Sequence, residues 1–578
     1  MKTHHLFTII VLFIFLPISG ISQQTPIAIV GGKIVNTDGS APLENSVIII
    51  EDAVITAAGA PDDVPIPEGA RVIEADGKWI IPGLIDTHIH FFQSGGLYTR
   101  PDIIDLREVV PYEDKELQWI RDNLNDTFAR YLRSGVTSVV DVGGPMWNFD
   151  VRRKASEEDA APRVIVAGPL ISTYQPDALT TGDSPIIEVD TPEEARELVR
   201  EQAEHDTDLI KIWYIVTRGR TVEDSLPIVE AVVDESRKYG ISVSVHATQL
   251  ETARAAVKAG AGILVHSVTD NVVDEEFITL LRENGVIYTP TLTVFERYPQ
   301  VFNQQIKFTI PEFRFAHPDI IESLFHPRAL SEEKLPDWLI QRMNDPQPIP
   351  DDRPELQNLK LLHEGGVTIA AGTDAGNIGT LHGPALFREF ELMKKAGLSS
   401  SDILTTATIN GAKLMGMEDR LGTIHPGKYA DLLLLNADPL DDIMNTSDIH
   451  KIIANGNVYS PEELLPVTPK ALVKQQVNAY NARNIDAFVS FYHPEATVYS
   501  FPDEVLASGH EEIYERYKQR FDEAPELHAK ITNRMVLGNI VIDEELITGI
   551  PGVDKLEAVV IYEVEGDYIV NSWIIVEN

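Results

Sequence analysis

The chain of 578 residues is too long for one ordinary domain, so its length predicts several. Its formal net charge of -41 argues against nucleic acid or an anionic membrane as a partner, because both would repel an acidic protein. The absence of cysteine excludes disulfides, thiolate ligands and a cysteine nucleophile, so any metal must be bound by nitrogen and oxygen atoms.

Residues 1–22 have the features of a secretory signal peptide. A lysine precedes an apolar run from Leu6 to Leu16, which is shorter than the ~20 residues that span a bilayer. Gly20 and Ser22 are small residues that suit a cleavage site. The sequence therefore predicts an exported protein, periplasmic or secreted, without membrane contact once the signal is removed.

Two β-rich segments flank the middle of the chain. Residues 23–80 contain short alternating apolar runs between turn residues, a pattern that predicts strands of a small antiparallel sheet. Residues 416–465 repeat this glycine-punctuated pattern. We expect the two flanks to form one composite β-sandwich domain, with the central region inserted between them.

The central region, residues 81–415, alternates apolar β-branched runs with amphipathic helical stretches, which indicates βα units and a mostly parallel sheet. Its repeated units predict an α/β fold of the (β/α)8 TIM barrel type, in which active sites lie at the carboxyl ends of the strands. The expected strands cover residues 84–90, 135–143, 163–171, 209–215, 241–247, 262–268, 286–292 and 367–376.

Potential metal ligands recur at the ends of these strands. His88 and His90 are two residues apart, so their side chains would point to the same face of the first strand. A single histidine in a strand is more often a core residue, but several donors at one rim of a barrel make that interpretation poor. The other donors are Lys211, His246, His266 and Asp374.

These motifs together resemble the amidohydrolase superfamily of metal-dependent hydrolases, in which a barrel is inserted in a composite β domain. The resemblance covers about residues 27–459 and includes PGLIDTHIH (82–90), AGTDAG (371–376) and GTIHPGKYADLLLLNADPL (422–440). The LIKIW segment (209–213) is similar to the branch of imidazolonepropionases and binuclear Xaa-Pro and Xaa-Arg dipeptidases, in which a lysine of the fourth strand is carboxylated.

The resemblance implies two divalent metal ions, with zinc as the default and iron, manganese or cobalt fitting similar ligands. Carboxylation of the lysine is needed because an ammonium group has no lone pair, whereas the carbamate is an anionic ligand with two oxygens. The implied ligands are His88, His90 and Asp374 for the buried ion, His246 and His266 for the more exposed ion, and carboxylated Lys211 between them.

The implied activity is hydrolysis of an amide bond in a small molecule of the dipeptide or N-acyl amino acid class. A metal-bridging hydroxide would attack the carbonyl, and Asp374 would carry its proton to the leaving amine. Asp86 would support the site by orienting a histidine.

Substrate contacts are expected beyond the fourth and eighth strands. A free carboxylate of the substrate would need a partner, which Tyr214, Arg218 or Arg220 could supply. His382 would either touch the substrate or cap a helix. The long insertion at residues 296–354 would be either a lid over the site or a packed surface excursion.

Two other functions remain open from the sequence. One is a mononuclear deaminase or cyclic amide or amidine hydrolase of the same superfamily, with Lys211 unmodified and His266 contacting the attacking water. The other is a non-catalytic scaffold or binding protein. The number of bound metal ions distinguishes these alternatives from the binuclear hydrolase.

Residues 466–578 resemble the SnoaL-like α+β cone fold. Because this fold hosts isomerases, binding modules and dimerisation units, the resemblance implies no single function. We expect an accessory or dimerisation role, and hence a possible homo-oligomer. His493, Tyr499 and Trp573 could line the cavity of the cone or belong to its core.

Overall fold

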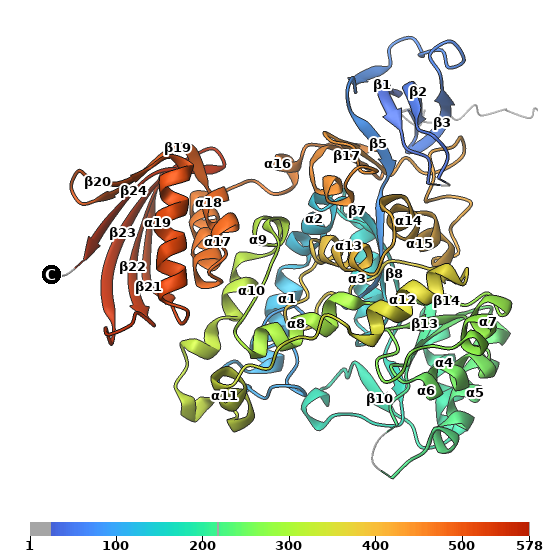
Figure 1. Cartoon of the computed structure of the whole chain (residues 1–578). Helices are drawn as coiled ribbons and strands as arrows, with labels where there is room; N and C mark the ends of the chain where they lie inside the picture. Colours follow the sequence, from blue (N-terminus) through green and yellow to red (C-terminus); the bar gives the residue numbers. More distant parts are fainter. Residues whose placement is uncertain (1–24, 38, 217–218, 577–578) are drawn as a thin grey trace, which may run out of the picture.

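The computed structural model describes residues 25–37, 39–216 and 219–576 (Figure 1). The expected signal peptide, residues 1–22, lies outside the described residues. Within the described ranges, no helix is both long and apolar enough to cross a membrane.

One sheet combines strands from both flanks of the chain, in the order β18-β17-β16-β5-β1-β2-β3, with β4 beside β1. The two flanks meet where β5 and β16 pair antiparallel, Trp79 opposite Leu435. The strands are β1 (Ile27–Ile34), β2 (Leu43–Glu51), β3 (Val54–Gly59), β4 (Arg71–Glu74), β5 (Trp79–Pro82), β16 (Leu432–Leu435), β17 (Ile449–Ala454) and β18 (Asn457–Tyr459).

This sheet is mixed, whereas the sequence predicted an antiparallel one. Strand β1 runs parallel to both β4 and β5. A bulge at Gly31, whose φ of 89° suits glycine, lets the first half of β1 pair with β4 and the second half with β5. All strands of the expected sandwich are thus hydrogen-bonded into one sheet.

The central region contains two parallel sheets, and strands overlap all the ranges expected from the sequence. One sheet has the order β6-β7-β8 and the other β10-β9-β11-β12-β13-β14-β15. The strands are β6 (Leu84–Ile89), β7 (Val136–Asp141), β8 (Arg163–Val166), β9 (Leu170–Ser172), β10 (Ile186–Glu188), β11 (Leu209–Trp213), β12 (Ser242–His246), β13 (Ile263–Val265), β14 (Ile287–Thr289) and β15 (Thr368–Ile369).

Contacts between β6 and the segment after β15 bring the edges of these sheets together. Ile89 forms an isolated parallel bridge with Ala375, and the Asp374 N–H donates to the His88 carbonyl at 2.7 Å. The expected third strand is split into β8 and β9 at residues 167–169. The central region is therefore a barrel-like arrangement of two parallel sheets.

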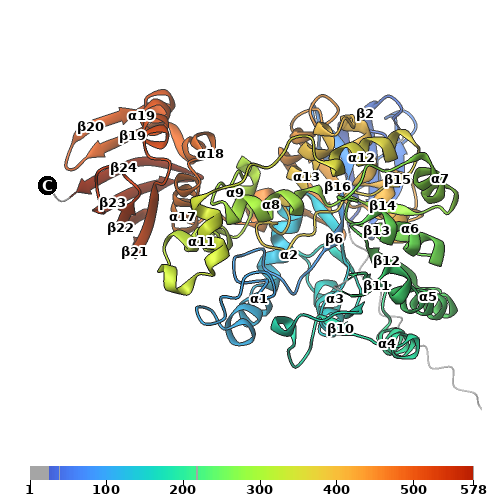
Figure 2. The same cartoon turned by 60° about the horizontal axis from the view of Figure 1, so that its bottom comes forward.

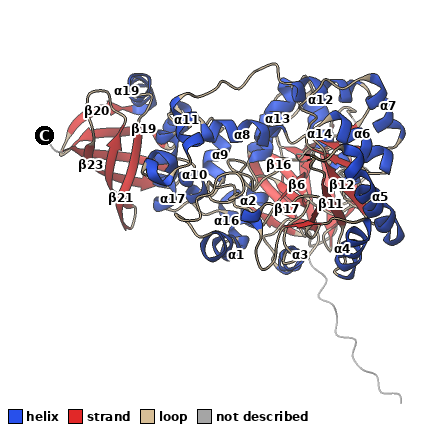
Figure 3. Cartoon of the chain, turned by 90° about the horizontal axis from the view of Figure 1, so that it is seen from below, coloured by secondary structure: helices blue, strands red, loops and turns tan. Residues whose placement is uncertain are grey.

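Helices surround the central strands (Figures 2 and 3). They face solvent on one side and the strands on the other, which is the layering expected of βα units. These helices are α1 (Gln118–Asp122), α2 (Leu124–Arg133), α3 (Asn148–Glu157), α4 (Pro192–Glu204), α5 (Val222–Tyr239), α6 (Leu250–Ala259), α7 (Glu275–Glu283), α12 (Pro354–Glu364), α13 (Ala385–Lys395), α14 (Ser400–Thr406) and α15 (Ile409–Leu414).

The insertion begins within α8 (Leu292–Phe302) and forms α9 (Ile310–Phe315), α10 (Pro318–Ser323) and α11 (Asp337–Asn344). Its helices α9 and α10 pack against the C-terminal domain, and Phe313 shares a buried cluster with Leu472. The Asn478 side chain donates to the Pro318 carbonyl at 2.9 Å. Most of the insertion is therefore a packed connection between the central region and the C-terminal domain.

The C-terminal domain lies at one end of the molecule, joined by α16 (Pro461–Leu464) (Figure 1). Its helices cover one face of a six-stranded sheet with the order β20-β19-β24-β23-β22-β21. The elements are α17 (Pro469–Asn481), α18 (Ile485–Ser490), α19 (Gly509–Glu523), β19 (Tyr492–Ser500), β20 (Glu504–Ser508), β21 (His528–Leu537), β22 (Ile540–Thr548), β23 (Leu556–Glu565) and β24 (Tyr568–Val576).

Candidate metal centre and active site

Three potential metal ligands meet where β6 ends and where the chain turns after β15. His88, His90 and Asp374 offer ligand atoms that all lie within 4.8 Å of one another. The Nε2 atoms of both histidines are 3.3 Å from Oδ1 of Asp374. The alternation of side chains along β6 places both imidazoles on one face, as the sequence predicted.

The donor atoms in this cluster have few protein partners. Both ring nitrogens of His88 and the Nζ atom of Lys211 are buried without a hydrogen bond. Because buried polar atoms nearly always have partners, these atoms suit the binding of a ligand. In contrast, Nδ1 of His90 lies 2.6 Å from the Gly143 carbonyl, so this nitrogen donates and Nε2 keeps its lone pair. These residues fit a metal ion.

His246 and His266 extend the cluster toward the open side. Their ring centroids are 4.4 Å apart, and the His266 ring is 4.7 Å from that of His88. Nδ1 of His266 lies 2.8 Å from the Thr291 hydroxyl. His266 and Asp374 have φ values of 72° and 64°, and such strain in residues other than glycine is often found at functional sites.

Burial lowers the pKa values of three basic groups of the cluster. Burial lowers the pKa of His88 and of His246 to about 3, with a further contribution from Lys211. Burial also lowers the pKa of Lys211 to about 7. Although burial would raise the pKa of Asp374, the neighbouring histidines hold it well below its usual range. His88 and His246 are therefore neutral nitrogen donors beside the charged carboxylate of Asp374.

Asp86 supports this cluster through the backbone. Its carboxylate accepts hydrogen bonds from the His88 N–H at 3.3 Å and from the Thr373 hydroxyl at 2.7 Å. It joins β6 to the segment that carries Asp374. The acidic residue beside a histidine ring is instead Asp141, whose Oδ1 is 3.9 Å from Nδ1 of His90.

A cavity of about 220 Å³ opens above the cluster. Its polar wall includes Arg100, Tyr298 and Asn377, which the sequence analysis did not identify. Asn377 donates to Oδ1 of Asp374 at 2.7 Å and accepts from the Tyr298 hydroxyl at 2.6 Å. The apolar wall comprises Phe92, Ile103, Leu170, Leu179, Ile186, Trp213, Val294 and Phe295.

Arg100 is the cation of this cavity. One side of its guanidinium is paired with Asp102, at 2.6 Å and 2.8 Å. Its Nη1 donates to Asn377 and lies 3.4 Å from the Tyr298 hydroxyl. Arg100 lies in the loop after the first central strand, where active-site residues of barrels are found, and this position is the signal that could have identified it.

The start of α8 is fixed from across the core. The carboxylate of Glu389 accepts hydrogen bonds from the N–H groups of Leu292 and Thr293 at 2.9 Å and 2.8 Å. These bonds satisfy donors at the first turn of the helix, which have no partner within it. Helix α8, in which the insertion begins, thus presents Phe295 and Tyr298 to the cavity.

Tyr214 and Arg220, two of the residues expected to bind a substrate carboxylate, lie outside the cavity. Tyr214 is buried and its hydroxyl donates to the Val222 carbonyl at 2.8 Å. Arg220 is 3.3 Å from the carboxylate of Asp190. Arg218 lies outside the described residues. Neither Tyr214 nor Arg220 lines the cavity, because the chain turns away from it after β11.

His382 has neither of its two expected roles. Its Nε2 lies 2.7 Å from the Gln93 carbonyl and therefore donates, which leaves Nδ1 to accept from the Tyr131 hydroxyl at 2.8 Å. The ring also stacks on Phe91, with centroids 5.8 Å apart. His382 is a buried residue that holds the loop carrying Gln93, which does line the cavity.

The fold and the site together define the class: an α/β protein with a candidate metal site at the strand ends of a barrel-like core. The chain belongs to the amidohydrolase family, whose model matches residues 79–459, and it is a hydrolase acting on carbon–nitrogen bonds. A SnoaL-like domain model matches residues 473–572.

Individual proteins show the same relationship at low identity. Ochratoxinase from Aspergillus niger is 23% identical over 456 residues, which cover 72% of this chain and 82% of that protein. A Xaa-Pro dipeptidase structure has a TM-score of 0.56 and 24% identity, covering 75% of this chain and 100% of that one. The molinate hydrolase structure has a TM-score of 0.57 and 23% identity, covering 78% and 97%.

Proposed function

We propose that this protein is an exported, binuclear metal-dependent amidohydrolase. It cleaves the amide bond of a small molecule of the dipeptide or N-acyl amino acid class. The strongest support is the buried nitrogen atoms of His88 and Lys211, which form no hydrogen bond with the protein. Two metal ions, with zinc as the default, would give these atoms their missing interactions.

His88, His90 and Asp374 would hold one ion, and His246 and His266 the other. Lys211 would lie between them as a carbamate. Its neutral amine would attack carbon dioxide, forming a nitrogen–carbon bond and releasing a proton, and the product is an anion with two ligand oxygens. The burial of Nζ supports this assignment, because an unpaired ammonium group in that position would be costly.

The ions, when bound, would polarise the substrate carbonyl and lower the pKa of the attacking water. Asp374 would accept the proton of that water and deliver it to the nitrogen of the leaving amine. Asn377 would orient the carboxylate through its hydrogen bond to Oδ1. The apolar wall of the cavity would exclude other water molecules.

Arg100 and the apolar wall suggest which amides fit. The guanidinium faces the cavity with one side anchored on Asp102, so it could pair with a free carboxylate of the substrate. Leu170, Ile186 and Phe295 would surround an apolar side chain or acyl group. The Xaa-Pro dipeptidase among the structural relatives supports a substrate with a terminal carboxylate.

Metal analysis tests this function. The protein is purified without chelator and with bicarbonate, and its metal-to-chain ratio is measured by elemental analysis. A ratio near two, falling in Lys211→Ala but not in the control Lys258→Ala, an exposed residue of α6, supports the binuclear hydrolase. A ratio near one favours the mononuclear deaminase or cyclic amide hydrolase. No binding, even after metal is added, favours the scaffold.

A substrate panel then separates the chemistries. Dipeptides and N-acyl amino acids are compared with lactams and aminated nucleobases, and release of the amine is measured. Turnover of the first two classes supports the proposal. Turnover of ring substrates alone contradicts it.

Export and the finer architecture belong to the same proposal. We expect the mature protein to begin at Gln23, which amino-terminal sequencing of the protein from the periplasm or medium would show. We also infer that the two parallel sheets act as one closed (β/α)8 barrel. The proposed domains are 23–80 with 416–465, 81–415, and 466–578.

A further inference from the structure

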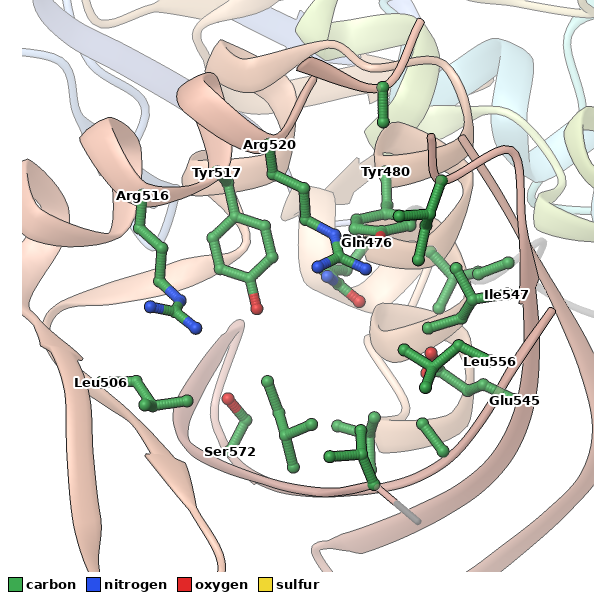
Figure 4. Close-up of a pocket in the computed structure, with 18 of the residues that line it drawn as sticks. Gln476, Tyr480, Leu506, Arg516, Tyr517, Arg520, Glu545, Ile547, Leu556 and Ser572 are labelled. Carbon is green, nitrogen blue, oxygen red and sulfur yellow. Dashed lines mark hydrogen bonds between the residues drawn. The ribbon is translucent and has the colours of Figure 1, made fainter. Parts of the chain in front are cut away.

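A second cavity, of about 900 Å³, lies in the C-terminal domain (Figure 4). Helices α17 and α19 form one side of it and strands β22, β23 and β24 much of the other. His493, Tyr499 and Trp573 do not line this cavity, and the rings of Tyr499 and Trp573 stack on each other at 5.6 Å instead. Its chemistry is therefore set by residues that the sequence analysis did not identify.

The sheet side of this cavity is mainly apolar. Ile547, Leu556, Val560 and Ile574 contribute aliphatic side chains to it. A cavity with such a wall and a volume in the range of about 300 to 1,000 Å³ is typical of sites for small organic molecules. The apolar wall would bind the body of a ligand.

Two buried polar side chains face the same space. Gln476 is 3% exposed, and its Oε1 atom is buried without a hydrogen-bond partner. Glu545 is 8% exposed, and one of its oxygens accepts from the Tyr562 hydroxyl at 3.1 Å. Because buried polar atoms are normally satisfied, the oxygen of Gln476 indicates a ligand or ordered water in the cavity.

Helix α19 supplies the positive charge. Arg516 and Arg520 are one helical turn apart and project with Tyr517 over the cavity (Figure 4). Nε of Arg520 donates to the Tyr480 hydroxyl at 2.9 Å. Among the ion pairs of the described residues, none involves either arginine, although the chain has 89 acidic and only 48 basic residues.

We propose that this cavity binds an amphipathic organic anion, with its apolar body against the strands and its carboxylate on Arg516 and Arg520. Two guanidinium groups without carboxylate partners favour an anion over a cation, and their planar arrays of N–H groups match a carboxylate. The depth of the apolar wall favours an organic acid over an inorganic anion. The site is separate from the histidine cluster and shares none of its lining residues.

Calorimetric titration of the full-length protein tests the site with two probes, naphthylacetate and naphthylethanol. They share the same ring system and differ in charge. The native protein should bind the anion about tenfold more tightly than the alcohol, as a charge-assisted hydrogen bond allows. The double variant Arg516→Gln/Arg520→Gln should lose this preference and keep its affinity for the alcohol.

Two further variants locate the effect. Lys518→Gln removes one positive charge from the same helix at an exposed ion pair with Asp522, and should leave both affinities unchanged. Arg516→Gln breaks no hydrogen bond or ion pair among the described residues, so a weakened anion affinity in this variant cannot come from misfolding around Tyr480.

Three results would overturn the proposal. They are equal affinity of the native protein for both probes, an anion affinity that is unchanged in the double variant, and an equal loss of affinity in Lys518→Gln. The second result would also arise if the anion bound at the histidine cluster. Metal content and amide hydrolysis should be unchanged in all these variants, which separates this test from that of the proposed function.

Discussion

The two cavities both contain a buried carboxyl group, but the chain sets the charge of these groups in opposite directions. Asp374 is surrounded by histidines that hold its pKa well below the usual range. Glu545 accepts a hydrogen bond from the Tyr562 hydroxyl, and burial and the nearby Asp543 carboxylate raise its pKa to about 7, although the Tyr562 hydroxyl, Arg534 and Arg520 oppose this rise. Both carboxyl groups are buried, so burial alone does not determine whether such a group is charged. The nearby charges and hydrogen-bond donors also set its pKa.

The largest effect is expected from Asp374→Asn, which removes the proposed proton carrier while keeping its size. Amide hydrolysis should fall by about a thousandfold, within the range for loss of a general acid–base group. Initial rates on the best substrate of the panel measure this. Asp352→Asn, on an exposed loop, is the control, and probe binding in the C-terminal cavity should not change. Retention of most of the activity would contradict the role of Asp374.

Glu545→Gln tests the second carboxyl group through stability. The folded protein holds a proton on Glu545 between its ordinary pKa of about 4.3 and the raised value, whereas the unfolded chain does not. Stability therefore falls as pH rises through this window, by up to about 3 kcal/mol from this group. The side chain of the variant cannot titrate. Its free energy of unfolding should therefore rise relative to that of the native protein between pH about 4 and about 7.

Scanning calorimetry at a series of pH values measures that difference for the transition of the C-terminal domain. Glu544→Gln, at an exposed position of the same strand, is the matched control. A constant difference between Glu545→Gln and the native protein at all pH values would show that Glu545 is charged when folded.

Arg100→Met tests the cation of the active-site cavity. The Michaelis constant should rise by about tenfold or more for substrates with a free carboxylate, because a charge-assisted hydrogen bond is lost. The same substrates with an amidated end should be unaffected. Arg220→Met, whose side chain pairs with Asp190 outside the cavity, should have no effect. Equal effects of the two variants would rule out Arg100 as the carboxylate partner.

The smallest effect is expected at the contact between the C-terminal domain and the insertion of the central region. Asn478→Ala removes the hydrogen bond to the Pro318 carbonyl and should lower the free energy of unfolding by about 1 kcal/mol. Denaturant unfolding followed by two probes, one for each region, measures this. Lys470→Ala, exposed on the same helix, is the control. An unchanged stability would mean that water replaces the lost bond.

Local patterns in the sequence predicted much of the strand arrangement. Apolar β-branched runs located the strands of the central region, and the spacing of His88 and His90 placed both on one face. The third strand was predicted as one piece, but Pro169 cannot donate a ladder hydrogen bond and the strand is split there. The mixed pairing of β1 was also missed, because the switch of partners at Gly31 depends on strands distant in sequence.

The polar wall of the active-site cavity was harder to predict than the candidate metal ligands. The ligands recur at strand ends and so have a repeating signal. Arg100, Tyr298 and Asn377 come from three separate loops or helices, and only the tertiary fold brings them together. The cations predicted from the sequence instead follow Lys211 in the chain, and proximity in sequence does not give proximity in space after a strand ends.

The contact between the insertion and α17 bears on whether the catalytic part of this enzyme can be produced without its C-terminal domain. Phe313 and Ile321 are fully buried in the same cluster as Leu472 and Val473. A chain cut after residue 465 would lose part of that cluster and present apolar side chains to water, a surface prone to aggregation. We therefore expect that the C-terminal domain cannot be removed without exposing this cluster. Helix α8, which lines the active-site cavity, leads directly into the helices that pack against the C-terminal domain.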